Sequence, residues 1–299
     1  MDVNHRNTGP VLVTGASGYV GSQIVPALLE RGLEVRTLSR RGTGPPGADA
    51  RTGDALSADG LPEALDGCRT AYYLIHSMGG KGADAASFAR RDREAAVNFG
   101  EAARAAGVER VIYLGGLDDG GEAGSEHLRS RHEVAALLRQ RVPELVYLRA
   151  AMIIGRASAS FVMLRSLVER LPAMVCPRWI DTRTQPVAIS DVVATAAEAA
   201  VRESVPAEVQ LGGADTLTYR EMMQRMAKVL GRRPPLIVKV PVLTPTLSSH
   251  WVALVTPVDA GLAKPLVAGL ASEMLVREPP PPGLNDHPMG FEEAARAAL

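Results

Sequence analysis

The chain has 299 residues, of which 46% are hydrophobic and 22% charged, the composition of a globular protein with enough length for a large core and an appended lobe. Its 33 basic and 33 acidic residues cancel, so no net field favours nucleic acid or an anionic membrane, and we expect neither as a partner. Cys68 and Cys176 stand far apart without a neighbouring ligand residue, which argues against a disulfide framework and against a metal site.

Short apolar runs alternate with helical patterns along the first half of the chain, which predicts a parallel sheet covered by helices on both faces. The expected strands are residues 11–13, 35–38, 48–52, 71–75, 111–114 and 145–148. The expected helices are residues 20–31, 85–106 and 126–141, and the glycines that follow the first two are typical helix terminators.

The alternation fades after about residue 150. Helices are predicted over 161–170, over 191–201 with Ser190 as the N-cap, over 219–230 behind a capping box formed by Thr218 and Glu221, and over 291–299. The uncharged stretch 240–258 is interrupted by prolines and is too short in helical terms to cross a bilayer, so we interpret it as a core or pocket helix.

The first strand turns through three glycines into a helical pattern, the layout that seats the diphosphate of a dinucleotide. In the sequence VLVTGASGYVG, Gly15 makes the tight turn, Gly18 lets the backbone approach the phosphates, and Gly21 lets the helix pack against the sheet. The loop is completed by Ser17, Tyr19 and Val20. A helix N-terminus offers unpaired amides and partial positive charge to the anion. We therefore predict nicotinamide dinucleotide binding, with a purely structural glycine turn as the alternative.

Further cofactor contacts are expected where the other strands end. The second strand ends at Arg40 and Arg41 without a carboxylate for the ribose hydroxyls, which favours NADP(H) and leaves NAD(H) possible. The alternative is that Arg40 and Arg41 are solvated loop charges without a role in cofactor binding. Residues Gly53 and Asp54 follow the third strand near the adenine position, and the fourth strand ends in Ile75, His76 and Ser77 over the middle of the cofactor. His76 is a candidate for a chemical role, or else a hydrogen-bonded bystander.

These motifs, with Leu148-Arg149, give the chain a resemblance to atypical or extended short-chain dehydrogenase/reductases, and within them to the NmrA-like and complex-I-subunit-like branch, judging by YLIHSM at 73–78 and YLGGL at 113–117. The resemblance implies an α/β fold with a Rossmann-type doubly wound parallel sheet and a smaller, mostly helical C-terminal substrate lobe. We assign residues 1–155 to the cofactor domain, with 185–212 returning to it, and residues 156–184 and 213–299 to the lobe.

The catalytic groups that the resemblance implies are absent. The chain has no Tyr-x-x-x-Lys pair, and Gly115 and Gly116 occupy the strand end that carries the family serine. By context His127 stands at the position of the tyrosine and Arg131 at that of the lysine. Histidine can donate a proton near neutral pH, whereas arginine stays charged and can only hold the ribose. His127 capping a helix or facing water is the alternative.

These observations lead to two main hypotheses. The first is an NADPH-dependent reductase of a carbonyl or polarised double bond in a mostly apolar small molecule. The second is a non-catalytic NAD(P)-binding sensor or regulator of the NmrA type, favoured by the missing catalytic set, and an assembly role like that of the complex-I subunit is a third. We expect a cytoplasmic monomer or homodimer.

Two features bear on the substrate. Small and hydroxyl side chains at 157–161 leave room for a sizeable ligand. Residues Trp251, Met222, Met223 and Met226 either line an apolar cavity or pack in the core.

Overall fold

The computed structural model describes residues 9–76, 85–118, 126–240, 257, 267 and 269–299. Its centre is a seven-stranded sheet in the order β11-β6-β5-β4-β1-β2-β3, and every neighbouring pair is parallel. The strands are β1 (Val11–Thr14), β2 (Val35–Ser39), β3 (Asp49–Thr52), β4 (Thr70–Tyr73), β5 (Arg110–Gly116), β6 (Glu144–Ala150) and β11 (Glu208–Leu211). The order reverses beside β1, and this switch point is where open parallel sheets bind ligands.

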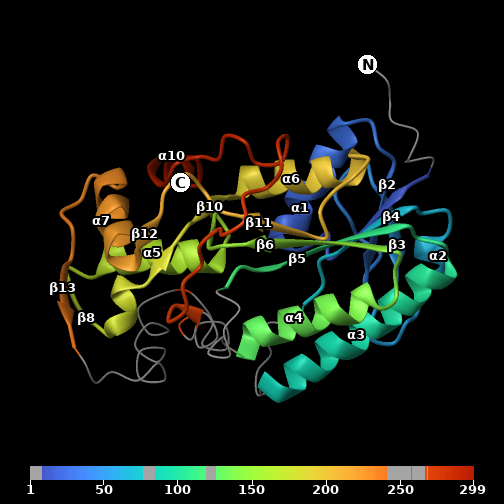
Figure 1. The fold of residues 1–299 in the computed structure, drawn as a ribbon, viewed down its shortest axis with the longest axis horizontal. Helices are drawn as coiled ribbons and strands as arrows, with labels where there is room; N and C mark the ends of the chain where they lie inside the picture. Colours follow the sequence, from blue (N-terminus) through green and yellow to red (C-terminus); the bar gives the residue numbers. More distant parts are fainter. Residues whose placement is uncertain (1–8, 77–84, 119–125, 241–256, 258–266, 268) are drawn as a thin grey trace.

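Helices cover the sheet on both faces (Figure 1). On one face lie α1 (Tyr19–Glu30) and α6 (Ile189–Val201), which contact each other, and on the other α3 (Ala85–Ala105) and α4 (Glu126–Arg139). The short helix α2 (Leu61–Leu65) packs beside α3. Each face buries its own apolar cluster, so the strands are apolar on both sides, as parallel strands between two helical layers require.

A smaller lobe follows the sixth strand and lies at the left of Figure 1. Its helices are α5 (Ala159–Arg170), α7 (Tyr219–Val229), α10 (Phe291–Ala297) and the 3₁₀ turn η1 (Arg178–Asp181). Two-stranded pairs tie it together: β8 (Ala173–Cys176) with β13 (Leu236–Lys239), β9 (Arg183–Thr184) with β12 (Leu217–Thr218), and β7 (Ile153–Ile154) with β10 (Val187–Ala188).

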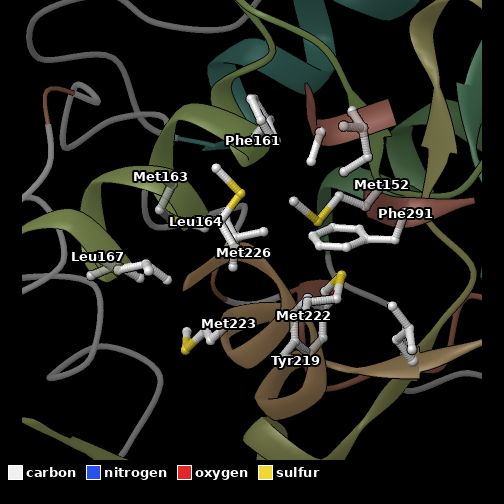
Figure 2. Packing of buried hydrophobic residues seen from close by; sticks show 14 of the residues in the cluster. Met152, Phe161, Met163, Leu164, Leu167, Tyr219, Met222, Met223, Met226 and Phe291 are labelled. Atoms are coloured by element: carbon white, nitrogen blue, oxygen red, sulfur yellow. The ribbon is translucent and has the colours of Figure 1, made fainter. Parts of the chain in front are cut away.

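The methionines of α7 pack in the core of this lobe. Met222 and Met226 are fully buried among Met152, Phe161 and Phe291, and Met223 lies on the other side of the cluster, near Leu167 (Figure 2). Of the two roles considered for these methionines, core packing holds for all three, and Met223 also lines a cavity. Trp251 lies outside the described residues.

Most predicted elements are confirmed, including the compositionally weak third strand and the capping box, in which the Thr218 and Glu221 side chains each accept from the other's backbone N–H. The prediction of Ser190 as an N-cap is wrong. Because β10 runs directly into α6, the helix begins at Ile189 behind the N-cap Ala188, and Ser190 falls in its first turn.

The pocket helix proposed within 240–258 lies almost wholly outside the described residues, and the domain boundaries stay a prediction. Among the helices of the described part of the chain, none is long and apolar enough to cross a membrane.

Candidate cofactor and substrate site

The glycine turn between β1 and α1 leaves no space for a side chain at Gly15 or Gly21. Gly15 has a φ of +68°, and a Cβ there would meet the Leu74 carbonyl oxygen at 2.7 Å. A Cβ on Gly21 would collide with the backbone of Gly15 and Ala16. The N-cap Gly18 makes no side-chain cap hydrogen bond, and the first turn of α1 holds no acidic residue. The Gly18 amide donates to the Gly15 carbonyl at 2.9 Å, whereas the amides of Tyr19, Val20 and Gly21 donate to no backbone carbonyl within the described residues. These first amides of α1 are therefore open to an anion, which fits the diphosphate of a dinucleotide.

A cavity of about 360 Å³ runs from this turn into the lobe. Its wall on the sheet side is formed by strand ends and the glycine turn: Gly15, Gly18, Tyr19, Val20, Gly21, Leu74, His76, Leu114, Gly115, Gly116, Ala150, Ala151, Met152 and Ile153. Its wall on the lobe side is formed by Ser158, Ala159, Ser160, Met163, Leu164, Leu167, Trp179, Tyr219, Met223, Val267, Gly269, Leu270 and Met274. The cavity thus lies outside the carboxyl ends of the parallel strands, where ligands of such folds bind.

Arg131 brings a buried positive charge to this cavity. It projects from α4, lines the cavity together with Leu128, and is only 5% exposed. Burial raises the pKa of Tyr113, and the charge of Arg131 opposes that rise. The guanidinium therefore lies close to the aromatic side chains of β4 and β5, where the charge of Asp92 also acts on Tyr73 and Tyr113.

An ionic network holds α4 against the sheet beside the cavity. The carboxylate of Asp118 accepts from Arg149 at 2.6 Å and pairs with Nε2 of His132 at 2.8 Å. Nδ1 of the same histidine lies 3.3 Å from the Tyr147 hydroxyl. The Tyr147 ring is stacked on Tyr113, with centroids 5.2 Å apart. The network fixes the Tyr147 ring directly against Gly115, where an added Cβ would lie 2.6 Å from the ring. It was not predicted from the sequence.

Tyr19 links the glycine turn to the lobe. Its hydroxyl occupies the space that a side chain at Gly155 would need, and the backbone N–H groups of Arg156 and Ala157 donate to it. Burial raises its pKa, and these two hydrogen bonds oppose the rise. Tyr19 therefore fixes the position of residues 155–157, which lie just before α5.

Many of the predicted site residues share the cavity. It is lined by Gly15, Gly18, Tyr19, Val20, Gly21, His76 and Arg131. Ile75 is not among its lining residues and packs, partly buried, against the core under α3. His127 lies in the first turn of α4, but its side chain, like all of Ser77, is outside the described residues.

The residues predicted for the adenine end lie beyond the cavity. Arg40 and Arg41 are exposed at the loop after β2. Ser17, which was predicted for the diphosphate loop, is exposed after β1 and likewise does not line the cavity. Gly53 is buried and donates its N–H to the Ser39 carbonyl at 3.1 Å. The carboxylate of Asp54 accepts from the Leu56 amide at 2.9 Å, which forms a local turn. Their contacts with a cofactor stay predictions. In the described part of the chain no cluster of His, Cys, Asp and Glu suited to a metal occurs.

The fold and the glycine turn define a Rossmann-type dinucleotide-binding protein. Residues 11–126 match the model of the NAD dependent epimerase/dehydratase family. The chain is 31% identical over 268 residues to a ceramide reductase of Caulobacter vibrioides, covering 86% of this chain and 83% of the relative. A 3 beta-hydroxysteroid dehydrogenase/Delta 5-->4-isomerase of Mycobacterium tuberculosis is 36% identical over 117 residues, which cover 35% of this chain and 31% of that protein.

Solved structures agree on the fold. The Citrobacter sp. triphenylmethane reductase complexed with NADP(H) superposes with a TM-score of 0.73 at 19% identity, covering 97% of this chain and 100% of that one. The structure of gox2253 gives a TM-score of 0.70 at 22% identity, covering 97% of both chains. The chain belongs to the NAD-dependent epimerase/dehydratase family, that is, to the extended short-chain dehydrogenase/reductases. The narrower NmrA-like assignment stays a prediction.

Proposed function

We propose that this protein is an NADPH-dependent reductase of a carbonyl or similarly polarised double bond in a mostly apolar small molecule. The observation that carries the proposal is a continuous cavity that joins the glycine turn to an apolar lobe, with Arg131 and His76 on its wall. The reductases among its relatives and structural neighbours support the reaction class.

The described residues suit the reaction in three ways. The amides of the glycine turn bind the diphosphate, and the apolar walls exclude water from the reacting atoms. A bound nicotinamide supplies the hydride. The Arg131 guanidinium holds either the nicotinamide ribose or the oxygen on which negative charge develops, and His127 is the proposed proton donor.

A preference for NADPH is part of the proposal and rests on Arg40 and Arg41, which are exposed beside the end of β2. Arg40→Ala is expected to remove a charge-assisted contact with the 2′-phosphate and to weaken NADPH binding by about ten- to a hundredfold while NADH binding stays the same. The control is Arg139→Ala, which removes an exposed arginine at the opposite edge of the sheet. Equal NADPH affinities in Arg40→Ala and the wild type would remove the preference.

The reductase is tested by NADPH oxidation across a panel of ketones, quinones and enones. His127→Ala is expected to lower kcat by about a hundredfold or more at unchanged NADPH affinity, and His287→Ala, an exposed histidine outside the cavity, to match the wild type. Tight NADPH binding without oxidation by any compound would instead favour the sensor that the missing Tyr-x-x-x-Lys pair suggests.

A further inference from the structure

The lobe end of the cavity differs chemically from its sheet end. Polar side chains on the wall at the sheet end and near it are those of Tyr19, His76, Arg131, Ser158 and Ser160, which lie at the start of α1, after β4, on α4 and at the start of α5. Beyond them the wall consists of apolar and aromatic side chains: Met163, Leu164, Leu167, Trp179, Tyr219, Met223, Val267, Leu270 and Met274. A ligand that fills the cavity must therefore be polar at one end only.

In the apolar part of the wall, Trp179 and Tyr219 carry a side-chain nitrogen or oxygen atom, and neither presents that atom to the cavity. The indole Nε1 of Trp179 and the hydroxyl of Tyr219 have essentially no accessible surface. The two rings meet edge to face, with centroids 5.9 Å apart, and form a fixed carbon wall. A polar group of a ligand placed against this wall would lose its water without gaining a hydrogen bond, which is unfavourable.

The apolar part of the cavity follows the axis of α5. Ser160 lies in the first turn and Leu167 two turns later, a distance of about 10 Å at 1.5 Å per residue. Around it stand Trp179 of η1, Met223 of α7 and Leu270, so the wall comes from four parts of the chain. Methionine side chains adapt to the shape of a flexible ligand. In Figure 2 Met163, Leu167 and Met223 lie on the side of the cluster away from Phe291.

We infer that the substrate carries a linear hydrocarbon chain that extends from the reacting carbonyl, beside Arg131, along α5 to the wall formed by Trp179 and Tyr219. This inference rests on the proposed reductase function and specifies its substrate class. It identifies Leu167, two turns into α5, as a residue that limits chain length.

The test is a series of linear methyl ketones, from 2-pentanone through 2-octanone to 2-undecanone, with a rigid steroid ketone for comparison. The value of kcat/KM is expected to rise by up to about fourfold for each methylene until the chain fills the cavity. Leu167→Phe should end the rise at a shorter ketone, so that the ratio of kcat/KM for 2-undecanone to that for 2-pentanone falls. The control is Val175→Phe, which adds the same ring at a position of β8 that is 47% exposed and outside the cavity.

A binding assay separates this inference from the proposed function. Fluorescent cis-parinaric acid, a linear polyene fatty acid, should be displaced by the ketones in the same order of chain length, whether or not NADPH is oxidised. If Leu167→Phe lowers the melting temperature, Met163→Phe repeats the test one turn earlier on α5. A kcat/KM that does not depend on chain length, displacement without such dependence, or a preference for the steroid ketone over every linear ketone would overturn the inference. Ordered displacement without oxidation would support it while refuting the reductase.

Discussion

The end of β5 at Gly115 offers a sharp test of how the site is built. The resemblance drawn from the sequence implies a serine in this region, whereas here the next strand fills the space with the Tyr147 ring. A Cβ added at Gly115 would lie 2.6 Å from both Cε2 and the hydroxyl of Tyr147. The matched control is Gly116, where a Cβ would meet only the terminal Cδ2 of Leu128 at 2.5 Å. Neither glycine adopts a positive φ.

The expected cost follows from what holds the Tyr147 ring. Moving it would lose the stacking on Tyr113, worth about 0.5–1.5 kcal/mol, and the contact with His132, worth about as much. We therefore expect Gly115→Ala to destabilise the protein by about 1–3 kcal/mol, the usual cost of overpacking. Gly116→Ala should cost less than about 1 kcal/mol, because the end of a leucine rotates away. The entropic gain of replacing glycine is shared by both variants and cancels in the comparison.

Chemical denaturation with tyrosine and tryptophan fluorescence measures both costs. In a Tyr147→Leu background, where the ring is absent, Gly115→Ala is expected to cost at least about 1 kcal/mol less than in the wild type, a coupling that only contacting residues show. Tyr147→Phe should give a smaller relief, because it removes the colliding hydroxyl and its contact with His132 but keeps the colliding ring carbon. Equal free energies of unfolding for Gly115→Ala and Gly116→Ala, or no coupling with Tyr147→Leu, would refute the packing argument.

Two further predictions concern stability. Asp118→Ala removes the partner of a largely buried Arg149 and should lower the free energy of unfolding by about 3 kcal/mol. The control Glu208→Ala, at a more exposed ion pair with the same arginine, should lower it by less than about 1 kcal/mol. Similar losses in the two variants would contradict the role of Asp118. Thr218→Ala should cost about 1 kcal/mol. The Thr218 amide and hydroxyl lower the pKa of Glu221. The stabilisation contributed by the Glu221 carboxylate is therefore complete above the ordinary glutamate pKa and is lost as pH falls through the lowered value, a dependence that Glu221→Gln should abolish.

The sheet and its helices were predictable because their signals are local. A buried strand is a short apolar run, a glycine ends a helix, and the glycine turn after β1 carries its geometry in its own residues. Even β3, whose four residues are all exposed, was located by the Gly53-Asp54 pair that follows it. The prediction of Ser190 as the N-cap was wrong because the neighbouring residues, and not the capping preference of serine, determine where α6 begins. The pairing of β10 with β7 brings the chain directly into the helix.

The cavity and the ionic network were not predictable in the same way, because they join residues far apart in the chain. Trp179 and Tyr219 form one wall across 40 positions, and nothing near either residue indicates the other. Asp118, His132 and Arg149 come from a strand end, a helix and a neighbouring strand, and only the fold brings them together. Arg131, by contrast, was singled out through its place in a family pattern; it lies on the cavity wall, and its contact with a cofactor stays a prediction.

The central claim is that the amides of the glycine turn hold a dinucleotide diphosphate, and isothermal titration calorimetry tests it most directly. The wild type is expected to bind NADPH with a saturable heat, and Gly21→Ala, whose Cβ would collide with the backbone of Gly15 and Ala16, to lose most of that affinity. Absence of a binding heat for NADPH, NADP, NADH and NAD alike, in a wild-type protein that unfolds cooperatively, would contradict the claim.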